Sequence, residues 1–338
     1  MVSTETLIKI IELLIFPGFL FLIFYSLFCE WIDRKFFARL QNRFGPLHTG
    51  YSGVLQPLAD LIKLLSKEDI TPSAADKLIM YTTPIILFSI PLTMIFMVPI
   101  LGSEAYINFE GDVVVMIFFF TILVIAVFMA GWSTFNRFSV LGGMRAALQM
   151  LSYEIPLSLA AIGPSILAKS ISLSGIVKWQ EESVFSFIKR PDPYSLVLGI
   201  ATAFVMIVGF AILTLCMLAE LEKVPFDIPE AETEIVSGWQ AEFSGRKLAL
   251  IRLGNNIKLV AASALMTTLF LGGPLGPGPV PAPVWFILKT ILCVVVLSNL
   301  RALFARFRID QVFQWAWRNL IPISILYIVA IEMLAWVM

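Results

Sequence analysis

The chain has 338 residues, of which 59% are hydrophobic and only 14% are charged, and its mean hydropathy is +0.89. An ordinary soluble domain carries about 25% charged residues, so the composition excludes a soluble globular protein. The formal net charge is zero, which gives no bulk attraction to nucleic acid.

Long apolar runs predict an all-α integral membrane protein, because about eight of them can cross roughly 30 Å of hydrocarbon as helices. Strands of a closed barrel would alternate over about ten residues, and runs such as VVVMIFFFTILVIAVFMA do not. No linker separates two domains, so residues 1–338 are expected to form one transmembrane domain. The expected spans lie near residues 7–28, 78–100, 113–132, 146–168, 195–218, 248–271, 283–300 and 320–337.

Basic residues follow the first expected span, in the stretch EWIDRKFFARLQNRFGPLHTG at residues 30–50. Such cations can anchor the chain at the membrane surface, or they can form a docking strip beside a cavity, and both interpretations stay open. The four cations are Arg34, Lys35, Arg39 and Arg43.

Residues 53–68, GVLQPLADLIKLLSKE, repeat apolar side chains at three- and four-residue spacings, with Asp60, Lys63 and Lys67 mostly opposite. The segment is too short and too charged to span a bilayer. It predicts an amphipathic helix that lies along the membrane interface.

Ionisable residues fall at or inside the expected spans or in the interfacial helix, and Glu154 and Lys258 are the two of most interest among Glu12, Glu30, Asp60, Glu154, Lys258, Lys289 and Glu332. At a helix centre each costs about 2.5–3.5 kcal/mol on insertion scales, so each is a functional candidate by default. Pro156 can free backbone groups near Glu154. Lys258 can pair with an acidic neighbour and hold a buried proton site.

The stretch AELEKVPFDIPEAETEIVSGWQAEFSGRK, residues 219–247, holds seven carboxylates and three cations between two apolar segments. Pro225 and Pro229 block regular helix, and a helix can begin at Glu230, which would place Glu230 and Glu234 on one face. The stretch is either a solvated loop or the lining of a proton-binding cavity, since crowded carboxylates titrate as a coupled set. The seven are Glu220, Glu222, Asp227, Glu230, Glu232, Glu234 and Glu242.

Loop charge predicts the orientation. With the N-terminus outside, the inside loops hold 17 Lys and Arg and the outside segments, including 169–194, hold five. The positive-inside rule then places the loops 30–77 and 219–247 in the cytoplasm and both termini outside the cell membrane. The basic, aromatic stretch 301–319 lies between two spans, so it indicates membrane anchoring rather than nucleic-acid binding.

The three cysteines, Cys29, Cys216 and Cys293, lack zinc or iron–sulfur spacing, and no glycine-rich nucleotide loop follows a strand. We therefore expect no catalytic residue, metal or cofactor in this chain.

Four stretches together resemble one family: DRKFFARLQNRFGP, GVLQPLADLIKLLSKEDITP, AGWSTFNRFSVLGGMRAALQMLSYE and AELEKVPFDIPEAETEIVSGWQAEFSG. They occur in the family's order between about residues 30 and 245. The family is that of the H subunit of bacterial complex I, which is equivalent to subunit 1 of mitochondrial NADH dehydrogenase and has relatives in membrane-bound nickel–iron hydrogenases.

The resemblance implies an eight-helix subunit at the junction of a peripheral redox arm and a membrane arm. It implies peripheral hydrogenase-like and iron–sulfur subunits and antiporter-like membrane subunits as partners, with iron–sulfur clusters and a nickel–iron centre held by those partners. Arg34 matches the family's chamber-side arginine and Glu154 its buried glutamate. The implied proton or charge relay comprises Glu154, Glu220, Asp227, Glu230, Glu232, Glu234 and Glu242, and we expect Lys258, singled out above as a charge inside a span, to take part in it.

Four positions that depart from the common family pattern indicate which branch of the family the chain resembles. Asp33 and Leu47 stand where the family commonly has Glu and Asn, and Glu222 and Lys223 stand where respiratory enzymes carry Asn and Arg. The chain thus resembles the archaeal hydrogenase and sulfur-reductase branch, which passes ferredoxin electrons to protons or sulfur. The alternatives are a quinone-chamber subunit of an NADH or F420H2 dehydrogenase and, in another class, a free-standing secondary transporter.

Overall fold

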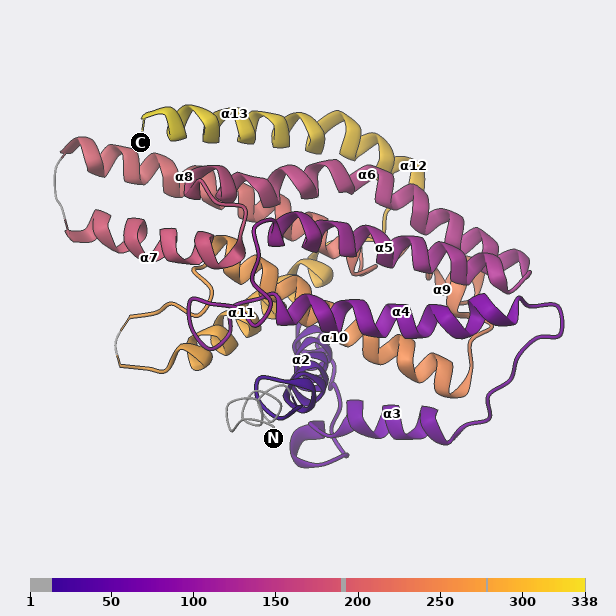
Figure 1. The fold of residues 1–338 in the computed structure, drawn as a ribbon. Helices are drawn as coiled ribbons and strands as arrows, with labels where there is room; N and C mark the ends of the chain where they lie inside the picture. Colours follow the sequence, from indigo (N-terminus) through magenta and orange to yellow (C-terminus); the bar gives the residue numbers. More distant parts are fainter. Residues whose placement is uncertain (1–13, 190–192, 278, 338) are drawn as a thin grey trace, which may run out of the picture.

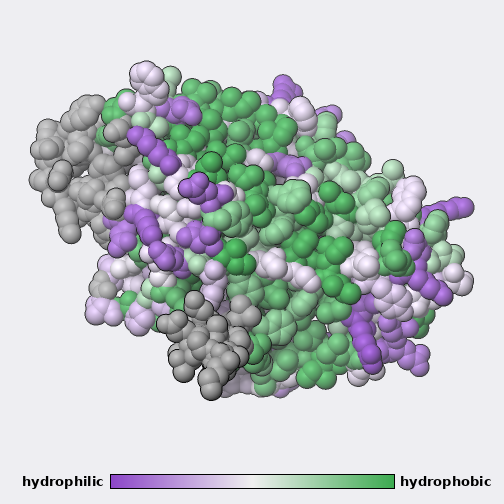
Figure 2. Space-filling view, in the orientation of Figure 1, coloured by the Kyte–Doolittle hydropathy of each residue, from purple (hydrophilic) through white to green (hydrophobic). Residues whose placement is uncertain are grey.

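The computed structural model describes residues 14–189, 193–277 and 279–337, apart from the side chains of residues 182–189, 193–197 and 232. Each regular element in this part of the chain is a helix, which confirms the all-α class. Seven of the described helices are long and apolar enough to cross a membrane. Figure 2 shows apolar side chains over the middle of one face and hydrophilic side chains toward its two sides. The chain is therefore a multi-pass membrane protein.

Figure 1 shows these helices lying side by side, with α9 at one end of the bundle and α7 at the other. The apolar helices are α4 (Lys77–Phe96), α5 (Asp112–Ser133), α6 (Arg137–Ala168), α8 (Pro193–Glu220), α10 (Gly245–Phe270), α11 (Ala282–Leu303), and α12 (Ile309–Trp315) continued by the π-helical η3 (Ala316–Leu320) into α13 (Ile321–Val337). The other described elements are α2 (Phe19–Leu40), η1 (Tyr51–Gly53), α3 (Gln56–Ser66), α7 (Leu173–Lys189), α9 (Glu232–Ile235) and η2 (Gly238–Gln240).

The first expected span, 7–28, begins outside the described residues. Residues 19–28 of this span belong to α2, which continues past the apolar run and carries Glu30, Asp33 and Arg34 to the cavity described below. The amphipathic helix predicted over 53–68 forms as α3. Its Leu64 is buried where α3 packs against α2 and α10, and Ile62 on another side is exposed.

Helix α10 is the central helix. In the most apolar 18-residue stretch of α10, 72% is buried, compared with 22% in the corresponding stretch of Ile309–Val337. Helix α10 packs against α2, α3, α4, α8 and α11. A Cβ on Gly254 would lie 2.4 Å from the backbone oxygen of Leu87, so the missing side chain is what lets α10 approach α4 this closely.

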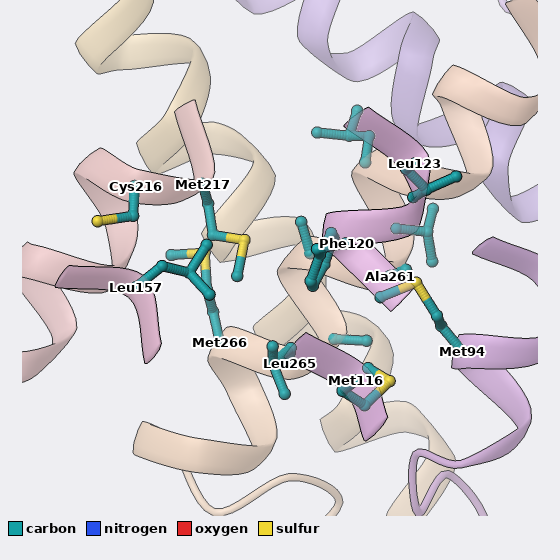
Figure 3. Close-up of a cluster of buried hydrophobic side chains, with 14 of the residues drawn as sticks. Met94, Met116, Phe120, Leu123, Leu157, Cys216, Met217, Ala261, Leu265 and Met266 are labelled. Carbon is teal, nitrogen blue, oxygen red and sulfur yellow. The ribbon is translucent and has the colours of Figure 1, made fainter. Parts of the chain in front are cut away.

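The apolar core is rich in sulfur. Figure 3 shows Met94 of α4, Met116 of α5 and Met217 of α8 gathered near Phe120, and all of these side chains are buried. Methionine fills irregular gaps between helices because its side chain is unbranched and polarisable. Against this apolar interior, each buried charge described below has a substantial desolvation cost.

Helix α7 was not predicted from the sequence, where 169–194 stood only as an outside segment. Leu173, Ile176 and Val177 follow the spacing of one helical face and are fully buried. The amide of Gln180 on the same face donates to the backbone oxygen of Leu269 at 2.6 Å. The segment is too polar for a spanning helix, so a search for apolar runs could not detect it, whereas its three- and four-residue periodicity could.

Candidate functional site

A cavity of about 220 Å³ lies where α2, α8, α10 and α11 meet. Its lining is unusual for the interior of a membrane protein because it carries both signs of charge. The carboxylates of the lining are Glu30, Asp33, Glu220 and Glu222. The cations of the lining are Arg34, Lys223, Lys258 and Arg301.

Glu220 and Lys258 form the innermost ion pair. Glu220 is the last residue of α8, and one of its carboxylate oxygens lies 2.7 Å from Lys258 Nζ in the middle of α10. Tyr153 of α6 donates its hydroxyl to the other oxygen at 2.7 Å. Lys258 also donates to the backbone oxygen of Glu220 at 2.6 Å, which satisfies an end group of α8. The pairing that the sequence allowed for Lys258 is therefore present, and its partner is Glu220.

Asp33 joins three elements at the same cavity. It accepts from Lys223, just after α8, at 2.8 Å and from Arg301 of α11 at 3.2 Å, and Ser298 donates to its other oxygen. Arg301 in turn lies over the ring of Phe37, 4.3 Å from the centroid. Two cations on one carboxylate at 4% exposure hold α2, α11 and the acidic loop together.

Arg34 connects α2 to α3. Its guanidinium is ion-paired with Glu30 and lies 2.7 Å from Asp60, and Asn256 donates to Glu30 from α10. Partial burial raises the pKa of Asp60, but the hydrogen bonds from Arg34 and Gln56 outweigh this and hold the pKa below its usual value. Asp60 therefore stays ionised.

Glu222 follows α8 with a left-handed backbone, φ 51°. Its carboxylate accepts a hydrogen bond from the indole nitrogen of Trp239 at 3.2 Å. Trp239 is buried, and Ser139 of α6 donates to its backbone oxygen at 3.1 Å. A Cβ on Gly142 would lie 2.6 Å from the backbone nitrogen of Trp239, so η2 packs directly on the α6 backbone. Burial raises the pKa of the Glu222 carboxyl, and Lys258 partly opposes that rise.

Four of the remaining acidic-loop carboxylates, Asp227, Glu230, Glu234 and Glu242, have partners outside the cavity lining. Glu234 pairs with Arg145 at 2.7 Å, and this hydrogen bond holds the pKa of the half-exposed Glu234 below its usual value. The other partners are Arg306 for Asp227 at 3.3 Å, Gln240 for Glu230 and Asn136 for Glu242. The side chain of Glu232 lies outside the described part of the structure.

The prediction that a helix begins at Glu230 is wrong. Helix α9 starts at Glu232 and has four residues, and Ala231 before it is not helical. Glu230 accepts from Gln240 and Glu234 accepts from Arg145, so the two carboxylates do not share a helix face. The four-residue spacing did not predict this because the chain after Pro229 folds back, so that Gln240 donates to Glu230 and Gly238 packs against the backbone oxygen of Pro229.

Glu154 lies on α6 next to Tyr153, outside the cavity lining. It is half-buried and accepts a hydrogen bond from Thr121 of α5 at 2.7 Å. Glu154 and Glu220 therefore accept from different partners, since the donor to Glu220 from α6 is Tyr153.

Of the four cations that follow the first expected span, Arg34 lines the cavity and the others do not. Lys35 donates to the backbone oxygens of Pro46 at 2.8 Å and Ser52 at 3.1 Å, which orders the loop between α2 and α3. Arg39 is exposed, and Arg43 lies over the ring of Phe37 at 5.5 Å. Among these four cations, Arg34 is therefore the one that lies beside the cavity, as the docking-strip interpretation requires.

The roles of Tyr153 and Arg301 were not predicted from the sequence. Asp33 and Lys223 were singled out as departures from a family pattern, and Glu222 both as such a departure and as one of the seven carboxylates of the acidic stretch. Tyr153 directly precedes Glu154, and Arg301 sits at the end of an expected span, so both were adjacent to features already singled out. Their contacts join residues 67 and 268 positions apart, which no local pattern reports.

These features define the class of protein: a multi-pass helical membrane protein with a mixed-charge cavity inside an apolar bundle. A family model described as NADH dehydrogenase matches residues 11–332. The chain belongs to the NADH dehydrogenase family.

Similar proteins cover most of the chain. The NADH-quinone oxidoreductase H subunit of Dehalococcoides mccartyi is 38% identical over 307 residues, which are 90% of this chain and 82% of that protein. The protein of that name from Geobacillus thermodenitrificans is 38% identical over 301 residues, 88% of this chain and 86% of its own length. One of the same name from Geobacter sulfurreducens is 34% identical over 332 residues, 92% of this chain and 90% of its own length.

Proposed function

We propose that this chain is the membrane coupling subunit of a complex I-like respiratory complex, in which it joins a peripheral redox arm to an ion-pumping membrane arm. The observation that carries the proposal is the buried Glu220–Lys258 pair beside a mixed-charge cavity. An anchor would gain nothing from charges that are costly to bury, whereas a protein that passes charge requires them.

Coupling of this kind requires two states with different proton affinities. Redox chemistry in a partner would change the charge or conformation at the acidic loop, and the carboxylates would respond. The ion pairs of Asp33 with Lys223 and of Glu234 with Arg145 connect this loop to α2 and α6, so they offer a route for that change. The proposed relay comprises Glu154, Glu220, Asp227, Glu230, Glu232, Glu234, Glu242 and Lys258.

The proposed assembly has the loops 30–77 and 219–247 in the cytoplasm and both termini outside. Peripheral hydrogenase-like and iron–sulfur subunits would cover the loops, and antiporter-like subunits would lie beside the bundle. Iron–sulfur clusters and any nickel–iron centre belong to those partners in this proposal, and the present chain supplies the charge relay.

For the electron acceptor we propose the ferredoxin-driven hydrogenase or sulfur-reductase branch. Support comes from Lys223 and Glu222, two departures from the respiratory pattern that both line the cavity. Lys223 lies 2.8 Å from Asp33. The lysine that stands in place of the usual arginine therefore forms an ion pair with the aspartate that stands in place of the usual glutamate. Metal analysis and mass spectrometry of the purified complex test this branch. A complex that contains nickel and a partner with four nickel-binding cysteines agrees with a hydrogenase, and one that contains NADH-binding subunits contradicts the proposed branch.

A second candidate is the quinone-chamber subunit of an NADH or F420H2 dehydrogenase. The observation in its favour is the cavity itself, together with the relatives' name, which is that of an NADH-quinone oxidoreductase. Quinone reduction by the purified complex, lost on Arg34→Ala at the cavity lining, would favour this candidate over the hydrogenase branch.

The coupling role is tested by Glu230→Gln and Glu234→Gln in the intact complex reconstituted in vesicles. We expect both variants to assemble, since each substitution keeps the size of the side chain, and to lose ion pumping while electron transfer continues. Glu68→Gln, an exposed change on the α3–α4 connection, is the matched control. Wild-type pumping stoichiometry in both relay variants would contradict the proposal. Purification of the chain without iron–sulfur or antiporter-like partners would instead favour a free-standing transporter.

A further inference from the structure

Glu222 differs from the other three carboxylates of the cavity, because no ion pair among the described residues includes it. Its hydrogen-bond donor is the neutral indole of Trp239 at 3.2 Å. The ion pairs of the other carboxylates are Glu220 with Lys258, Asp33 with Lys223 and Arg301, and Glu30 with Arg34.

The nature of the partner decides how easily each carboxylate can bind a proton. Protonating Glu220 would leave the ammonium group of Lys258 buried without a counter-charge, which is strongly unfavourable. The indole N–H of Trp239 is a donor only, and it can donate either to a carboxylate or to the carbonyl oxygen of a neutral carboxyl group. Glu222 can therefore change protonation without orphaning a buried cation.

The backbone conformation at Glu222 indicates that the glutamate side chain itself is needed at this position. The N–H groups of Glu222 and Lys223 bond back to Ala219 and Leu218, which closes α8 with a left-handed residue at 222. Glycine and asparagine suit that position best, because a Cβ crowds the backbone there. A glutamate held in this conformation beside a cavity is the kind of outlier that points to function.

We propose that Glu222 is the proton-binding site of the cavity: it takes a proton from cavity water and passes it to the other carboxylates of the proposed relay, while the Glu220–Lys258 pair keeps its charges. This inference rests on the proposed coupling function. An O–H bond to the donating water or hydronium breaks and a bond to a Glu222 oxygen forms, the same proton leaves in the next step, and no electron moves.

The surroundings of Glu222 fit such a step. A polar cavity of about 220 Å³ has room for several water molecules. Burial also raises the pKa of Glu222 above that of an ordinary glutamate, which brings proton binding closer to neutral pH. The charged groups that line the cavity with Glu222 are Glu220 from α8, Lys223 from the following loop, Lys258 from α10, Glu30, Asp33 and Arg34 from α2, and Arg301 from α11.

Infrared difference spectroscopy of the purified complex during a pH titration tests the proposal directly. We expect a protonated-carboxyl band that titrates above the range of an ordinary glutamate, and we expect Glu222→Gln and Glu222→Asn to lose it. Asparagine is favourable at a left-handed position, so Glu222→Asn should fold at least as well as the wild-type chain. The control Glu68→Gln should keep the band. Persistence of the band in both Glu222 variants would overturn the proposal.

Trp239→Phe gives an independent readout. It removes a hydrogen bond that favours the charged carboxylate, so the midpoint of the band should move to higher pH. An unchanged midpoint would contradict a direct role for the indole and for Glu222.

Pumping measurements separate this inference from the coupling role. Wild-type pumping in Glu222→Gln together with lost pumping in Glu230→Gln would overturn the role of Glu222 and leave the coupling role standing. Loss of the band in Glu222→Gln with normal pumping in every variant would overturn the coupling role and leave Glu222 as a proton-binding site.

Discussion

Glu220 and Lys258 lie 2.7 Å apart at 2% and 8% side-chain exposure, and they tie the end of α8 to the middle of the central helix α10. Removing one partner of such a pair leaves an uncompensated buried charge and costs about 3–5 kcal/mol. We therefore expect Lys258→Met or Glu220→Gln to lower the thermal stability markedly. The double variant should recover much of the loss, because it buries no unpaired charge.

The melting temperatures of these variants can be measured in detergent with a thiol-reactive dye. The buried free cysteines Cys29, Cys216 and Cys293 become accessible to the dye on unfolding. Equal melting temperatures for Lys258→Met and the wild-type chain would show that Lys258 is not ion-paired in the protein.

The contact of Asp60 with Arg34 should make stability depend on pH. The pKa of Asp60 is lowered in the folded protein, so the stabilisation is fully present above the unfolded-state value of about 3.9 and is lost as the pH falls through the lowered folded-state value. We expect the difference in melting temperature between wild type and Asp60→Asn to shrink over that acidic window. A constant difference from neutral pH down to about pH 3 would contradict this expectation.

Tyr327 of α13 packs into gaps left by two glycines, one on α6 and one on α8. A Cβ on Gly163 would lie 2.2 Å from the Tyr327 hydroxyl oxygen, and one on Gly209 would lie 2.4 Å from it. That hydroxyl is buried and has no hydrogen-bond partner among the described residues. Leaving a buried polar group unpaired costs about 1–3 kcal/mol, so Tyr327→Phe should raise the melting temperature and Gly163→Ala should lower it. A lower melting temperature for Tyr327→Phe would indicate a bound water at this hydroxyl.

The approach of α10 to α4 depends on Gly254. A Cβ there would meet the backbone oxygen of Leu87 at 2.4 Å, and a backbone group cannot move aside as a flexible side chain can. We expect Gly254→Ala to destabilise the protein by about 1–3 kcal/mol, measured as a lower melting temperature. Gly102, which has open space around its Cβ position, provides the matched control in Gly102→Ala.

Much of the fold could be predicted because spanning helices depend on runs of apolar residues that are contiguous in the chain. The helices α4, α5 and α10 match expected spans closely, and α3 matches the amphipathic stretch. The helix α7 was missed because it is half polar, and the helix expected from Glu230 was wrong because the loop after Pro229 folds back on itself.

The site was predicted less completely than the fold. Glu220, Lys258 and Arg34, which the sequence singled out, all line the cavity. Glu234 and Glu154, also singled out, lie outside the cavity lining, where Glu234 pairs with Arg145 and Glu154 accepts a hydrogen bond from Thr121. Charge density along the chain indicates that carboxylates are present, but it does not report which cation each one meets.

The amino-acid sequence alone determined the membrane class, the positions of most spans and the family, because hydropathy and motif order are properties of neighbouring residues. Only the tertiary structure decided which carboxylates of the cavity are ion-paired and which one accepts from a neutral donor. The ion pairs that neutralise Glu220 and Asp33 join residues 38, 190 and 268 positions apart, and such contacts exist only once the helices have packed. Among the described residues, the partner of Glu222 is the neutral indole of Trp239 and not a cation, and this difference arises from the packing of η2 on α6.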